Sequence, residues 1–175
     1  DRGWSRGAPR LGPHLRFVKG RAALELAAMG AGTSPDELLQ EAQADLEQAR
    51  TLDANNAQVY HYLAQVFVER GERAASVGDR NAQAAAEKQA DEILAEGVRA
   101  APDVPEAHIH ALARKLAVTR RGTIAEAREQ MRGLESEYEA LTRRFASSPR
   151  AFAARAQFYS FFASHLDTVS ALDKL

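Results

Sequence analysis

Apolar residues recur every three or four positions along the chain, and short polar or breaking segments separate the periodic stretches. One clear stripe consists of Leu39, Ala42, Leu46 and Ala49. This spacing places apolar side chains on one face of an α-helix. No segment shows the sustained alternation that is typical of strands. The pattern therefore predicts an all-α protein with about seven helices, at residues 13–29, 35–52, 57–77, 80–100, 106–120, 124–146 and 149–165.

The N-terminal segment differs in composition from the rest of the chain. Residues 1–12 combine three glycines and a proline with several arginines, which predicts a flexible basic lead-in. Pro13 suits the first position of a helix, because that residue has no helical partner for its N–H group. We therefore expect a single helical domain over residues 13–175.

The last predicted helix is rich in aromatic residues. Phe152, Tyr159 and Phe162 share one stripe with an alanine, which predicts that they pack inward, with Phe158 and Phe161 partly to the side. Residues 165–175 could fold back over these side chains. Otherwise Phe158 and Phe161 form an exposed apolar patch that serves as an interface for a partner or for self-association.

The turns between helices reveal an internal repeat. Ala54, Pro102 and Pro149 are 48 and 47 residues apart and occupy matching turns. A leucine precedes each of them by eight residues. The positions four residues before the turns carry Arg50, Val98 and Phe145, of which only the arginine is not apolar. A spacing shared by helix and turn together indicates a repeat of helical hairpins.

The second and third predicted helices carry the densest motif. The matching residues are Ala42, Leu46, Ala49, the turn Leu52-Asp-Ala-Asn-Asn56, Tyr60, Leu63, Ala64, Phe67 and Gly71. This segment resembles the tetratricopeptide repeat family, with an alanine in place of the usual proline at 54 and of the usual glycine at 64. Residues 90–116 resemble a second copy, and residues 141–159 a weaker third one.

The resemblance implies antiparallel hairpins stacked as a short right-handed solenoid. The family repeats about every 34 residues, whereas this chain repeats every 47 or 48. The surplus would lengthen each helix by roughly 10 Å, at about 1.5 Å per residue. HEAT-type repeats have a natural period near this length and are the alternative fold.

In this family the first helix of each hairpin lines a concave groove. The resemblance therefore implies a groove lined by Gln58, His61, Gln65, Glu69, His110 and Arg114. Such residues could hydrogen-bond a bound peptide, and arginine could pair with its carboxylate. The alternative is that they are exposed polar residues on solvated helix faces. The lysine-asparagine clamp of chaperone-binding family members is absent, so we do not expect binding of chaperone C-termini.

Composition and charge narrow the choice of function. The net charge is −1 and the chain has no cysteine, so we expect no nucleic-acid partner and no thiolate metal site. Charge is locally uneven, with a basic N-terminal stretch followed by an acidic one over residues 36–47. These could be solvated faces or a charge-graded surface that selects a partner.

The sequence lacks motifs for membrane insertion, catalysis and metal binding. No apolar run approaches the roughly 20 residues that span a bilayer, so we expect no direct membrane insertion. The sequence contains no nucleophile elbow, phosphate-binding glycine loop or His-Glu-x-x-His motif. We accordingly predict no enzyme, no cofactor and no metal.

The function predicted from the sequence is a scaffold or adaptor that binds a protein or peptide through the groove or the C-terminal aromatic helix. The alternatives are a structural spacer or self-association module, and an enzyme of unfamiliar helical type. The chain begins at Asp1 and could be a fragment of a larger or anchored protein. Its composition suits a bacterial cytoplasm or periplasm equally.

Overall fold

The computed structural model describes the backbone of residues 8–30, 34–119 and 124–172, and the side chains of residues 12–30, 34–119 and 129–164. Within these ranges the chain forms seven α-helices and no strand, which confirms the predicted all-α class. The chain divides into two compact units, Asp1–Pro102 and Asp103–Leu175. The continuity of residues 13–175 as one domain stays a prediction.

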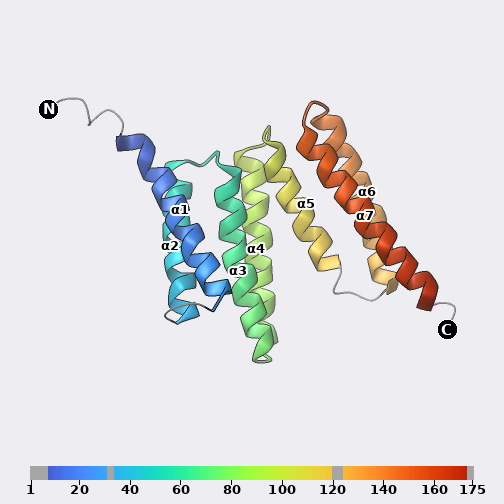
Figure 1. Ribbon diagram of the computed structural model, residues 1–175, viewed down its shortest axis with the longest axis horizontal. Coiled ribbons are helices and arrows are strands. Elements are labelled where there is room, and N and C mark those ends of the chain that lie inside the picture. The colour runs from blue at the N-terminus through green and yellow to red at the C-terminus, as the bar shows by residue number, and fades with distance from the viewer. Residues whose placement is uncertain (1–7, 31–33, 120–123, 173–175) are drawn as a thin grey trace. The chain divides into compact units, whose positions relative to one another are not determined.

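The first unit contains two pairs of helices. α1 (Ala8–Ala28) lies along α2 (Pro35–Leu52), and α3 (Ala57–Ser76) lies along α4 (Arg80–Ala100), as Figure 1 shows. α2 packs on α3 and so joins the two pairs. The core between the helices consists of fully buried apolar side chains, chiefly Leu39, Leu46, Val59, Leu63 and Val66.

The second unit contains α5 (Pro105–Thr119), α6 (Ile124–Arg144) and α7 (Pro149–Leu172). Each of these helices packs against the other two. Tyr138 of α6 stacks on Phe158 of α7, with their ring centroids 4.8 Å apart. The core around this pair adds Leu112, Leu134, Leu141, Ala151 and Ala154.

The helix bounds follow the predicted ones closely except at the two ends. α1 begins at Ala8 and holds Pro13 in its interior, so residues 8–12 are helical and not part of a flexible lead-in. The proline removes one hydrogen bond near the start of the helix, and the preceding turn stays helical. Residues 1–7 lie outside the described residues. α7 continues to Leu172, so residues 165–172 extend the helix and do not fold back over it.

Two glycines allow neighbouring helices to approach closely in the first unit. A methyl group placed on Gly97 of α4 would come within 2.8 Å of the Cβ atom of Tyr60 on α3. One placed on Gly20 of α1 would come within 2.7 Å of the Leu46 side chain and 3.0 Å of the Ala42 carbonyl oxygen on α2. Real Cβ atoms do not tolerate such distances, because the neighbours are backbone or stem atoms. Each helix pair is therefore held at a spacing that only glycine permits.

Hydrogen bonds fix both ends of the turn between α2 and α3. The N–H group of Asp53 donates to the carbonyl of Ala49 and closes α2. The Asn56 side chain accepts the N–H of Gln58 and starts α3. The Tyr60 hydroxyl donates to the carbonyl oxygen of Ala54 at 3.0 Å. The Tyr60 side chain thus binds the turn at Ala54 and also packs against α4 at Gly97.

The close approach at Gly97 yields a stability prediction. Gly97→Ala should lower the free energy of unfolding by about 1–3 kcal/mol, because the added methyl group meets the stem of Tyr60. Gly71→Ala on α3 is the matched control, because its methyl group would make only ordinary contacts of 3.6 Å or more. The control should be neutral or stabilising by up to about 1 kcal/mol through helix propensity. Urea unfolding of both variants measures this difference, and equal effects would contradict the packing argument.

Candidate functional site

The residues predicted to line a groove fall into two sets. Gln58, His61, Gln65 and Glu69 lie on α3 in the first unit, whereas the other two lie on α5 in the second unit. The four α3 positions occupy the side of the helix that points away from its core-facing residues. Gln65 is exposed, and the other three are half-buried. The structure therefore brings four of the six predicted residues onto one helix face.

The α5 residues have more enclosed surroundings. Arg114 is buried, and the adjacent Lys115 pairs with Glu137 of α6 at 2.6 Å. His110 is half-buried, and burial lowers the pKa of its imidazole, while the nearby Glu106 carboxylate partly offsets that effect. Glu106 is bound by Arg150 of α7 at 2.5 Å. Burial alone would raise the pKa of Glu106, but its own backbone N–H and the Arg150 guanidinium together hold it below the usual value.

Phe158 is a core residue and not part of an exposed patch. Its side chain is 1% exposed, whereas Phe152, which was expected to pack inward, is half exposed. The buried face of α7 runs instead through Ala151, Ala154 and Phe158. Large side chains dominate the periodic pattern of α7, but the two small alanines mark the face that packs closely. Phe161, the second predicted interface residue, is half-buried.

The uneven local charges pair with one another across the first unit. Three ion pairs join residues far apart in sequence, namely Arg16–Asp45 at 2.5 Å, Arg73–Asp36 at 3.2 Å and Arg50–Glu96 at 3.1 Å. The acidic stretch at residues 36–47 thus contributes to contacts between helices. Because these charges are paired within the fold, fewer of them remain to form the charge-graded surface that could select a partner.

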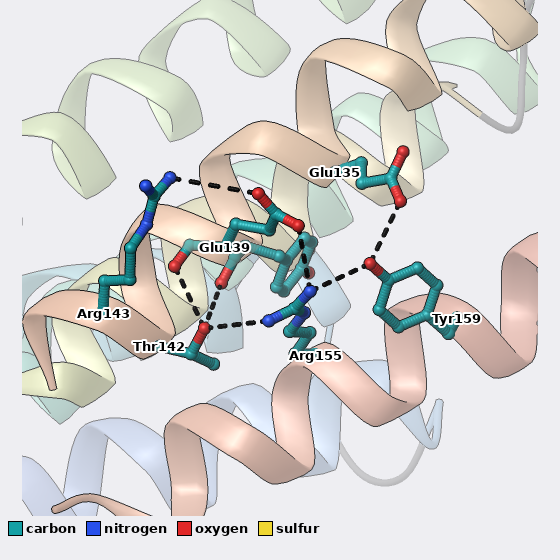
Figure 2. Close-up of polar contacts among 7 residues, drawn as sticks. Glu135, Glu139, Thr142, Arg143, Arg155 and Tyr159 are labelled. Atoms are coloured by element: carbon teal, nitrogen blue, oxygen red, sulfur yellow. Dashed lines mark hydrogen bonds and ion pairs between the residues drawn. The ribbon is translucent and has the colours of Figure 1, made fainter. Parts of the chain in front are cut away.

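A polar network joins α6 to α7 in the second unit, as Figure 2 shows. The Arg155 guanidinium donates to Glu139 at 3.1 Å, to the Thr142 hydroxyl at 3.3 Å and to the Tyr159 hydroxyl at 3.1 Å. Tyr159 in turn donates to Glu135 at 3.0 Å. Both carboxylates therefore accept hydrogen bonds from α7. The network fixes the register of the two helices, and its acids are occupied by partners within the fold.

The first unit has a surface hollow of about 370 Å³ at the junction of α2, α3 and α4. Its floor is apolar and consists of the buried residues Leu63, Phe67 and Ile93. Its rim is polar and charged, with Glu47, Arg50, Gln89, Glu92, Glu96 and Arg99. The volume lies near the lower end of ligand pockets, which span about 300–1,000 Å³. An apolar floor with a polar rim suits an anchoring side chain of a protein partner.

Hydrogen bonds hold one wall of this hollow in place. Arg70 of α3 donates to the side-chain oxygen of Gln43 on α2 at 2.6 Å, and the Gln43 amide donates to Glu47 at 2.7 Å. The Arg70 guanidinium also lies over the Phe67 ring, 5.2 Å from its centroid. The rim carboxylate and the aromatic floor are therefore positioned by the same arginine. A preorganised wall lowers the entropy lost when a partner binds.

Arg50 was the one sequence signal for this hollow. It occupies the repeat position that is apolar in the two later turns, at Val98 and Phe145. In the structure it is half-buried and pairs with Glu96 of α4, across the hollow that both residues line. A charged residue at an otherwise apolar repeat position thus marked the site. The remaining rim residues showed no pattern that would set them apart from a solvated helix face.

Neither a membrane-spanning helix nor a cluster of metal ligands occurs in the part of the chain that the structure describes. Within it, no helix is long and apolar enough to cross a bilayer. Among the same residues, no group of three or more histidine, aspartate or glutamate side chains could hold a metal ion.

Comparisons with known proteins do not identify a family for this chain. No protein-family model matches the chain, and neither a curated protein nor a solved structure is significantly similar to it. The resemblance to tetratricopeptide repeats therefore stays a prediction.

The lowered pKa of His110 predicts a pH-dependent stability. Because the folded state binds this proton less readily than the unfolded state, stability should fall as the pH drops below the unfolded pKa of about 6.5, until it passes the folded value. Glu106 titrates at lower pH, since its folded pKa is also lowered, and its contribution is lost only there. His110→Gln should therefore lose less stability than the wild type between about pH 7.5 and pH 5.5.

Hydrogen exchange of the α5 to α7 amides would measure this in the second unit alone. His14 is exposed on α1 in the first unit, so His14→Gln should keep the wild-type slope for these amides. The same slope in His110→Gln and the wild type would exclude His110 as the cause.

Proposed function

We propose that this chain is a protein-binding module made of tetratricopeptide-like hairpins that stack as a short right-handed solenoid. Two features of the first unit support the likeness to tetratricopeptide repeats. Its helices pair as α1 with α2 and α3 with α4, with the Leu52–Asn56 turn between the pairs. Gly97 lies at the position where the repeat requires a small residue and meets Tyr60 of the paired helix.

The observation that carries the binding function is the hollow between α2, α3 and α4. Its floor of Leu63, Phe67 and Ile93 offers apolar contact, and its rim offers hydrogen bonds at fixed positions. A partner would insert one aliphatic or aromatic side chain and lay adjacent backbone across the rim. Apolar anchors of this kind carry most of the affinity in many protein interfaces.

The charges on the rim also favour one type of residue beside the anchoring side chain of the partner. Three carboxylates and two guanidinium groups line the hollow, and Arg50 is already paired with Glu96. The rim therefore carries an excess of one negative charge. A peptide with a basic residue beside its apolar anchor complements this rim best. The module would hold such a segment without chemical change, as an adaptor does.

The experiment selects peptides from a random library displayed on phage and measures their affinity by fluorescence anisotropy with the full chain. Gln89→Trp places a bulky side chain at the rim of the hollow, at an exposed position that does not belong to the core. It should weaken binding of the selected peptides by about tenfold or more, as loss of an anchor pocket does.

The matched control is Gln65→Trp, which changes another exposed glutamine to the same residue on the predicted groove face of α3. Peptides bound in the hollow should keep their affinity for this variant. Loss of binding with Gln65→Trp alone would assign the site to the predicted groove. A library that yields no binding peptide would overturn the proposed function.

A further inference from the structure

α1 carries apolar side chains on two opposite sides. One side consists of Gly20, Ala23, Leu24 and Ala27, which are buried. The other side carries Leu15, Val18 and Leu26, and Met29 continues it in the turn directly after α1, where its N–H still donates to the Glu25 carbonyl. The side chains of these four residues are between 44% and 76% exposed. At about 100° per residue these four, with the exposed Ala22 between them, lie within roughly 80° of arc and opposite the buried side. A helix that faces water on this side would be expected to be polar there.

The exposed apolar stripe reads the same in both directions. Its members, residues 15, 18, 22, 26 and 29, are separated by steps of three, four, four and three residues. The pattern is therefore symmetric about Ala22. Two antiparallel copies of α1 would place Leu15 against Met29 of the other copy and Val18 against Leu26. The small Ala22 would meet its own equivalent, which allows the helix axes to approach closely.

The charges beside the stripe favour the antiparallel direction. Arg21 and Glu25 border one edge and pair within the helix at 2.7 Å, whereas Lys19 lies near the other edge. In an antiparallel pair equal edges meet, so Arg21 would lie about 3 Å along the axis from Glu25 of the other copy and equally far from Arg21 of that copy. The two-fold axis gives two contacts between Arg21 and Glu25 for the one contact between the two Arg21 side chains. In a parallel pair opposite edges meet, and Arg21 would lie equally near Lys19 of the other copy. Only the first arrangement is attractive on balance.

We propose that two copies of this chain associate through α1, antiparallel and related by a two-fold axis at Ala22. Such an interface is isologous, because each copy offers the same patch. The stripe is about 21 Å long at 1.5 Å per residue, so the contact is small for a specific interface. The dimer is consequently weak and forms with increasing protein concentration. The proposal does not depend on the hollow between α2, α3 and α4.

Sedimentation velocity of the full chain across the micromolar range tests the association. The wild type should shift from monomer to dimer as its concentration rises. Val18→Glu and Leu26→Lys change exposed residues of the stripe, so they should leave the fold intact and weaken the dimer by about tenfold or more. Val77→Glu is the matched control, because Val77 is an exposed valine outside α1. This control should dimerise as the wild type does.

Mixing the two charged variants tests the direction of the helices. In the antiparallel pair, Glu at position 18 of one copy faces Lys at position 26 of the other, so the mixture should dimerise more tightly than either variant alone. A parallel pair gives no such contact and no tighter dimer. The chain has no cysteine, so an equal mixture of Leu15→Cys and Met29→Cys should also form an intermolecular disulfide that neither forms with itself.

Three results would overturn the proposal. The first is a wild type that stays monomeric over the whole range. The second is a dimer that Val18→Glu and Leu26→Lys leave unchanged, which would assign association to another surface. The third is disulfide formation within Leu15→Cys alone and not in the mixture, which would assign the parallel arrangement.

Discussion

The first unit depends on the contact between Gly97 of α4 and Tyr60 of α3. Because no side chain separates the helices at this point, the stem of Tyr60 lies against the backbone of α4. The same tyrosine donates its hydroxyl to the Ala54 carbonyl in the preceding turn. One residue therefore couples the spacing of a helix pair to the position of the turn that enters it. Burial of that ring also raises the pKa of the Tyr60 hydroxyl, which keeps it a donor.

This spacing has a consequence further along the same side of α3. α3 packs against both α2 and α4. Its residues Leu63 and Phe67 form the floor of the hollow, and residues of α2 and α4 form the two walls. The ion pair between Arg50 and Glu96 joins the two walls. A longer side chain at position 97 would push α4 outward and change the distance that this pair must cross. The packing of the core and the shape of the hollow are therefore set by the same contact.

The helices could be predicted from the sequence because their signals are local. Apolar periodicity and the turn residues placed the bounds of α2, α3 and α4 within about one residue, well inside the usual error of such reasoning. The face that each helix buries was harder to predict, because burial depends on what the helix packs against. α7 buries Ala151 and Ala154 and exposes Phe152, while α1 exposes Leu26 and buries Leu24 together with small residues. The hollow has residues from three helices, so only Arg50, the misfit in the repeat, could point to it.

The two surfaces of the first unit are compatible with simultaneous use. The hollow is lined by α2, α3 and α4, whereas the apolar stripe lies on the side of α1 that faces away from its buried residues. Pairing through α1 would therefore leave both hollows of a dimer open. A dimer with two equal sites binds a divalent partner more tightly than either site alone, since the second contact becomes intramolecular. A weak pair of helices and a shallow hollow could in this way act together, so that partner binding favours dimerisation and dimerisation favours binding.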